Sequence, residues 1–146
     1  MKLTSPAFAN NGKIPSKYTC EGEDVNPPLV FDDVSEDTKS FVLIVEDPDA
    51  PAKTWVHWVV FNIPPYTREI DEDTVPDDAL LGRTDFGNKS YGGPCPPSGT
   101  HRYIFKLYAL DTELDLEVGV TRREVEYAMQ GRVIDEAQLT GLFSRD

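Results

Sequence analysis

Two histidines and an aspartate stand at the ends of the most apolar segments of the chain. Asp47 closely follows one apolar run, and the chain's two histidines, His57 and His101, stand at or just before the start of two others. A polar side chain on an apolar face must be hydrogen-bonded or must line a cavity. Two interpretations are therefore open: the three side chains converge on one site, or each histidine is a hydrogen-bonded core residue, which is the commoner case.

The same residues allow three chemistries that their spacing does not favour. Asp47, His57 and His101 are ligand types for zinc or iron, but the short histidine spacings typical of metal sites are absent. A triad of Ser98, His101 and Asp47 lacks the G-x-S-x-G elbow. Cys95 lies between two prolines, which indicates a structural cysteine. We therefore expect a binding protein without a metal or cofactor rather than an enzyme.

Short apolar runs bounded by turn residues predict the strands that position these side chains. The runs 41–45, 55–63 and 103–110 are rich in β-branched and aromatic residues, as strands are. The pair Asn11-Gly12 is typical of a two-residue hairpin turn. Together these features predict an antiparallel or mixed β-sandwich with helices at one end.

Residue parity assigns the faces of these strands. On a straight strand every second side chain points to the same face. Each of the three polar residues is then predicted to share an apolar face with its neighbours: Asp47 with Phe41, Leu43 and Val45; His57 with Val59, Phe61 and Ile63; and His101 with Tyr103, Phe105 and Leu107.

One helix is predicted near the C-terminus. Thr121 and Glu124 form a capping box, apolar residues recur at helical spacing from Val125, and Gly131 is a candidate C-cap. The last segment, 134–143, fits either a second short helix or an extended piece.

The charge of the chain excludes two classes of partner. It carries 26 acidic and 14 basic side chains, for a net charge of -12. Such a surface repels nucleic-acid backbones and anionic lipid surfaces. No apolar run reaches the roughly 18 residues that a membrane span needs, and the first residues do not form a secretory signal. We expect a single domain over residues 1–146, located in the cytoplasm without membrane insertion, and a homodimer is left open.

The two cysteines, Cys20 and Cys95, lie far apart in sequence. They are either two unrelated thiols in a reducing cytosol or a disulfide-bonded pair that the fold brings together. Both interpretations remain open at this point.

Two separate motifs resemble the phosphatidylethanolamine-binding protein family, which includes the Raf kinase inhibitor protein and the plant flowering regulators. The likeness is to its bacterial and archaeal branch and covers nearly the whole chain. The resemblance is specific because two separate motifs occur in the same order and at a similar spacing as in the family. The matching segments are DPDAP at 47–51 with WVHW at 55–58, YGGPCPPSGTHRY at 91–103, YTCEG at 18–22, NPPL at 26–29, and AMQG at 128–131 with EAQL at 136–139.

The resemblance implies a fold and a site. The fold is a β-sandwich of a large and a small sheet with one or two short C-terminal helices. The site is a small anion pocket at one end of the large sheet. The residues it implies for this pocket are Asp47, Asp49, His57, Pro97, His101 and Tyr103, with Gly93 near the rim.

The function that these expectations favour is binding of phosphate, a phosphomonoester or a phosphoethanolamine-type lipid headgroup. Asp47 then either holds a histidine or meets a protonated group of the ligand. The resemblance also implies an alternative, because the family includes inhibitors of serine proteases: such an inhibitor would act through the exposed, Gly- and Pro-rich loop 82–100. A second alternative is a small hydrolase or lyase that uses His101.

Overall fold

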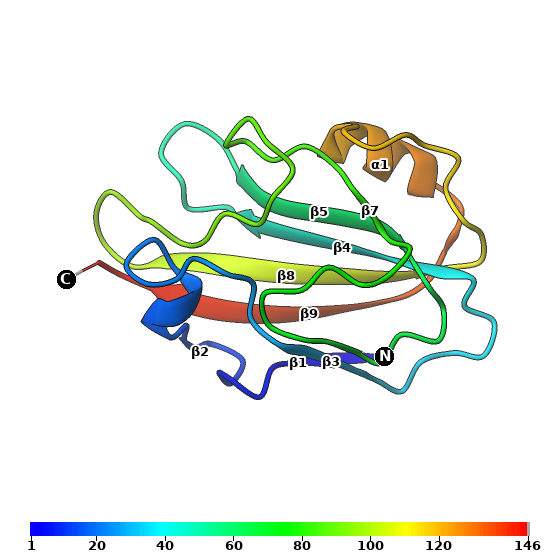
Figure 1. Ribbon diagram of the computed structural model, residues 1–146, viewed down its shortest axis with the longest axis horizontal. Helices are drawn as coiled ribbons and strands as arrows, with labels where there is room; N and C mark the ends of the chain where they lie inside the picture. Colours follow the sequence, from blue (N-terminus) through cyan, green and yellow to red (C-terminus); the bar gives the residue numbers. More distant parts are fainter. Residues whose placement is uncertain (146) are drawn as a thin grey trace.

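Six strands form a large sheet in the order β2-β9-β8-β4-β5-β7 (Figure 1). All its neighbouring strands run antiparallel except β2 and β9, which are parallel. The computed structural model describes residues 1–145. The strand bounds are β2 Gly12–Lys13, β4 Ser40–Asp47, β5 Trp55–Ile63, β7 Leu80–Leu81, β8 His101–Leu110 and β9 Val133–Phe143.

A smaller sheet of three strands packs on one face of the large sheet. Its order is β1-β3-β6, with antiparallel pairing. Leu29, Phe31 and Ile70 from this sheet share one buried cluster with Phe41 and Leu43 of β4. The predicted sandwich of a large and a small sheet is therefore confirmed. The bounds are β1 Lys2–Thr4, β3 Leu29–Asp32 and β6 Glu69–Ile70, and a short 3-10 helix, η1, spans Ser16–Tyr18.

Helix α1, Arg122–Met129, covers the opposite face of the large sheet (Figure 1). Thr121 and Glu124 form the predicted capping box, and Val125 and Met129 are buried against the sheet. Gly131 has a φ of 75°, the left-handed conformation that commonly ends a helix. The segment after α1 is strand β9, so the C-terminal region has one helix and an extended piece.

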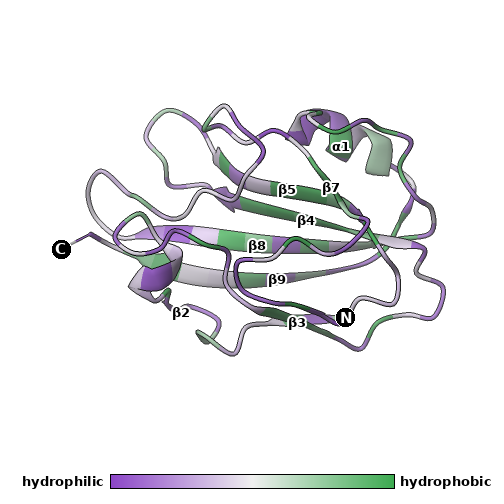
Figure 2. Cartoon of the chain, viewed as in Figure 1, coloured by the Kyte–Doolittle hydropathy of each residue, from purple (hydrophilic) through white to green (hydrophobic). Residues whose placement is uncertain are grey.

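Strand β4 is buried along its whole length because both of its faces are covered. Its alternate residues enter the two clusters on either side of the sheet. Figure 2 shows that β4 and β5 are mostly hydrophobic, whereas β8 and the loops mix hydrophobic and hydrophilic residues. None of the helices among residues 1–145 has the length and apolar composition to cross a membrane.

A β-bulge at His57 alters the faces that parity predicts for β5. Consecutive residues of β4 oppose positions two apart on β5 here, so His57 is the extra residue. Val59 and Phe61 pack on the helix side of the sheet, whereas His57 packs against the ring of Tyr103 on the other side. The prediction that His57 shares a face with Val59 and Phe61 is therefore wrong, because it assumes a straight strand.

The predicted hairpin at Asn11-Gly12 is also wrong. The two residues do turn the chain, with Asn11 at a φ of 65° and Gly12 N–H donating to the carbonyl of Ala9. The strands on either side do not pair with each other, however. Strand β1 pairs with β3, and β2 pairs with β9. The turn thus carries the chain from the small sheet to the edge of the large one.

Candidate functional site

The polar residues meet where β4 ends and where β5 and β8 begin. Because β4 runs antiparallel to both neighbours, its C-terminal end lies beside their N-terminal ends. This brings Asp47, His57, His101 and Tyr103 to one pocket of about 240 Å³. A pocket of this size suits a small ligand. Apolar groups form the rest of the lining: Ala50, Pro51, Trp55, Phe86, Pro96, Pro97 and the disulfide-bonded Cys95.

His101 and Asp47 form a buried pair at the base of the pocket. His101 Nδ1 lies 2.7 Å from Asp47 Oδ2, and both side chains are almost fully buried. The other carboxylate oxygen of Asp47 accepts the backbone N–H of Asp49 at 2.7 Å. Both oxygens of Asp47 therefore have a partner within the protein, and His101 keeps Nε2 free for a ligand.

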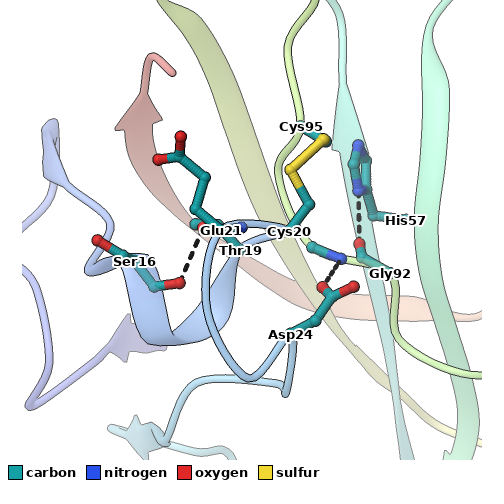
Figure 3. The surroundings of a disulfide bond; sticks show 9 residues. Ser16, Thr19, Cys20, Glu21, Asp24, His57, Gly92 and Cys95 are labelled. Carbon is teal, nitrogen blue, oxygen red and sulfur yellow. Dashed lines mark hydrogen bonds between the residues drawn. A yellow bond between two sulfur atoms is a disulfide. The ribbon is translucent and has the colours of Figure 1, made fainter. Parts of the chain in front are cut away.

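His57 is held in a defined tautomer by a backbone carbonyl. Its Nδ1 lies 2.6 Å from the carbonyl oxygen of Gly92 (Figure 3). A carbonyl oxygen only accepts, so Nδ1 carries the proton and donates. Burial of the ring lowers the pKa of His57, and this outweighs the opposing effects of the Gly92 bond and of nearby Asp47. His57 is thus neutral at pH 7, and its Nε2 is a hydrogen-bond acceptor.

Tyr103 contributes a hydroxyl with no acceptor in the protein. The residue is 1% exposed, and although the backbone N–H of Cys95 lies toward Oη, the O–H donates to no residue of the described chain. Burial, with a smaller contribution from the charge of Asp47, raises the pKa of Tyr103 well above its usual range. The group is therefore a protonated O–H donor. A buried donor without a partner calls for a ligand or water to satisfy it.

Aromatic rings build the wall beside His57. The ring of His57 meets those of Phe86 and Tyr103 edge-on, with both centroid distances at 5.3 Å. Trp55 packs edge-on against Phe86 at 5.7 Å. Gly92 permits this arrangement, because a Cβ there would lie 2.3 Å from the Phe86 ring. Sequence reasoning missed Phe86, which stands in an irregular loop without any periodic pattern.

Asp49 does not line the pocket, although the resemblance implied that it would. Its carboxylate accepts three hydrogen bonds from Arg102: from the backbone N–H at 2.9 Å, from Nε at 3.0 Å and from a terminal guanidinium nitrogen at 2.8 Å. These bonds lower the pKa of Asp49 to about 2. Asp49 thus fastens the turn after β4 to the start of β8 and holds Asp47 beside His101.

Gly93 also lies behind the pocket rather than in its lining. Its N–H donates to Asp24 Oδ1 at 2.7 Å. A Cβ on this glycine would lie 2.4 Å from the carbonyl oxygen of Tyr18. Gly93 therefore lets the segment before β8 pack closely on the loop after η1. Pro97, in contrast, belongs to the pocket lining.

Cys20 and Cys95 form a disulfide across these two loops, with their Cα atoms 5.5 Å apart (Figure 3). The two cysteines are therefore a disulfide-bonded pair and not two unrelated thiols. Because its sulfur is in a disulfide, Cys95 is not a thiol nucleophile in this state.

The remaining catalytic candidates do not assemble. Ser98 is exposed and does not line the pocket that holds the His101–Asp47 pair. No three side chains among residues 1–145 are arranged to hold a metal ion through histidine, cysteine or carboxylate groups. The pocket therefore combines a few hydrogen-bonding side chains with apolar walls, as ligand-binding pockets commonly do.

The sequence of the chain was compared with those of known protein families and proteins. Residues 4–144 match the family model of the phosphatidylethanolamine-binding protein. A UPF0098 protein of Methanothermobacter thermautotrophicus is 51% identical, covering 99% of both chains. One of Aquifex aeolicus is 48% identical over all of this chain and 90% of its own length.

Solved structures agree with the sequence relatives. The crystal structure of a phosphatidylethanolamine-binding protein homologue from Chlamydia trachomatis matches with a TM-score of 0.96 and 43% identity, covering 99% of this chain and 97% of that one. Escherichia coli YbcL, described as a new member of the mammalian family, matches with a TM-score of 0.92 and 32% identity, covering 99% and 98%. The chain therefore belongs to the phosphatidylethanolamine-binding protein family.

Proposed function

We propose that this protein binds small phosphate-type anions in the pocket at the end of β4: phosphate, a phosphomonoester or a phosphoethanolamine-type headgroup. One observation carries the proposal. Each of the two histidines has one nitrogen engaged by the protein and the other free, and Tyr103 beside them has a free hydroxyl. Three side chains, each with a polar atom still free to hydrogen-bond to a ligand, thus share one small pocket.

Asp47 acts on His101 rather than on the ligand. A bare carboxylate would repel an anion, but both oxygens of Asp47 already accept hydrogen bonds. When His101 carries both of its protons, its Nε2–H donates to a ligand oxygen in a charge-assisted hydrogen bond. Asp47 then balances the charge of the imidazolium and keeps the ring aimed at the pocket.

The neutral state of His57 makes binding depend on a proton. A phosphomonoester loses its second proton with a pKa of about 6. The monoanion still has a P–OH group that can donate to His57 Nε2, whereas the dianion has none. Binding of the dianion must therefore take up a proton. Affinity for a phosphomonoester should fall by up to about tenfold per pH unit above pH 6 to 7.

The apolar walls favour a ligand with an organic part over free phosphate. Trp55, Phe86 and Pro51 offer ring faces and edges next to the polar groups. An ammonium group, as in phosphoethanolamine, gains from an aromatic face within about 6 Å. We expect tighter binding of O-phosphoethanolamine than of inorganic phosphate.

Isothermal titration calorimetry of both ligands at pH 6 and pH 8 tests the proposal. We expect binding at pH 6 and weaker binding at pH 8. Tyr103→Phe should weaken it by about tenfold, since one hydrogen bond to a charged group is lost. Tyr108→Phe is the matched control, because Tyr108 lies on the same strand against the opposite cluster. Absence of binding at both pH values by the folded, ligand-free protein would refute the proposal.

A further inference from the structure

The disulfide joins two loops at the wall of the pocket. Cys20 follows η1, and Cys95 lies 75 residues later in the segment that leads into β8. Figure 3 shows the bond beside Gly92 and His57. Both cysteines are exposed residues at the surface of the protein.

The segment around Cys95 is well anchored on one side of the disulfide only. Before Cys95, the Tyr91 hydroxyl donates to the carbonyl of Tyr18 at 2.8 Å, and Gly92 N–H donates to the carbonyl of His57 at 3.1 Å. The carbonyl of Pro94 accepts the N–H of Cys20 at 3.1 Å.

After the disulfide, the chain has no such anchors. Residues 96–100 make no hydrogen bond to any other described residue, and the backbone N–H of Cys95 lies toward the hydroxyl of Tyr103. The next fixed point is His101, the first residue of β8. The disulfide is therefore the last attachment to the rest of the protein before residues 95–100. This stretch contributes Cys95, Pro96 and Pro97 to the pocket lining.

We propose that reduction of the Cys20–Cys95 disulfide controls the affinity of the pocket for its phosphate-type ligand. This rests on the function proposed above. The reductant is a dithiol. Its thiolate attacks one sulfur of the bond, which forms a mixed disulfide and releases the other cysteine as a thiolate. Its second thiol then attacks the reductant's sulfur in the mixed disulfide and releases the remaining cysteine. Two electrons and two protons end on Cys20 and Cys95 as thiols, and the dithiol becomes its own disulfide.

Reduction loosens the wall but leaves the base of the pocket in place. The buried cluster between the sheets and the His101–Asp47 pair do not include the sulfur atoms. The bond of His57 to Gly92 lies on the anchored side of Cys95. In the reduced protein a ligand must order residues 95–100 when it binds. Fixing the conformation of each of these residues costs free energy. We therefore expect the reduced protein to bind the ligand at least about tenfold more weakly than the oxidised protein.

The test compares three forms of the full chain: protein purified without reductant, the same protein in dithiothreitol, and the C20S/C95S double variant. O-phosphoethanolamine is titrated by calorimetry at pH 6. Hydrogen–deuterium exchange of the peptide covering 91–103 is measured without ligand. We expect weaker binding and faster exchange after Cys95 in both forms that lack the bond. The double variant should not respond to dithiothreitol.

The outcomes separate the two proposals. Equal affinity in the oxidised and reduced forms overturns redox control and leaves the phosphate pocket standing. No binding in any form overturns the phosphate pocket and, with it, control of its affinity. If hydrogen–deuterium exchange over residues 95–100 does not change on reduction, the claim that reduction loosens the wall is overturned, even if the affinity for the ligand changes. Loss of the native circular dichroism spectrum on reduction also overturns the switch, because the bond would then hold the fold rather than the pocket.

Discussion

His101 Nδ1 lies 2.7 Å from Asp47 Oδ2, and this buried contact joins two residues that are 54 positions apart in sequence. The pair is formed by the antiparallel pairing of β4 with β8, since the end of one strand lies at the start of the other. It leaves His101 one free nitrogen in a pocket that also contains His57 and Tyr103. The predictions below follow from this pair and from the groups that hold it.

Asp47→Asn should weaken phosphate binding without unfolding the protein. The amide oxygen can still accept a hydrogen bond, but the negative charge beside His101 is lost. We expect about tenfold lower affinity at pH 6 and a loss of about 1 to 3 kcal/mol in the free energy of unfolding. Calorimetry and urea unfolding measure the two effects. Asp111→Asn is the control, because Asp111 pairs with Arg132 just after the far end of β8, away from the pocket. The affinity of this variant should stay within about twofold of the wild type.

Tyr103→Phe should leave the free energy of unfolding unchanged or raise it by up to about 1 kcal/mol. The buried hydroxyl donates to no acceptor within the described chain, so its removal leaves no protein acceptor unsatisfied. Urea unfolding with and without saturating O-phosphoethanolamine checks this. The wild type should gain more stability from the ligand than the variant does. A loss above about 1 kcal/mol without ligand would show that the hydroxyl has a structural partner.

The pair of Asp49 and Arg102 should contribute to acid stability in a defined window. The folded-state pKa of Asp49 is about 2, against an ordinary value of 3.8. A depressed carboxyl pKa stabilises the fold above the ordinary value, and the contribution is lost as the pH falls from about 4 to about 2. The effect is small because the pair is partly exposed to solvent. Unfolding curves of Asp49→Asn should therefore approach those of the wild type as the pH falls through this window. A difference that stays constant from pH 7 to pH 2 would contradict the assignment.

Loss of the disulfide should lower the free energy of unfolding by about 2 to 4 kcal/mol. The bond closes a loop across a sequence separation of 75, and the unfolded chain gains entropy when the bond is absent. Urea unfolding of C20S/C95S measures the loss. A difference below about 0.5 kcal/mol would mean that the bond does little to constrain the unfolded chain.

The central strands and the helix could be predicted from sequence because their signals are local. The apolar run 55–63 and the capping box at Thr121 each show their pattern within a few residues. The hairpin expected at Asn11-Gly12 does not form, because the choice of partner strand depends on the sheets as a whole. A local turn motif does not indicate which distant strands pair with each other.

The sequence indicated which polar residues lie in the candidate site, but it did not indicate how all of their side chains are oriented. Strand ends and the family likeness indicated Asp47, His57 and His101, which line one pocket. Parity placed His57 on the wrong face because a bulge adds one residue and turns the side chain over. Asp49 could not be separated from the pocket residues, since its partner Arg102 follows from the register of β8 and not from any motif.

The most direct test of the central claim is a histidine NMR spectrum of the ¹⁵N-labelled protein, which contains two histidines. Before ligand is added at pH 7, we expect His57 to be neutral with its proton on Nδ1. Saturation with O-phosphoethanolamine at pH 6 should shift the Nε2 signals of both His57 and His101. If a saturating ligand leaves both Nε2 signals in place, or if His57 is charged at pH 7, the described binding site is contradicted.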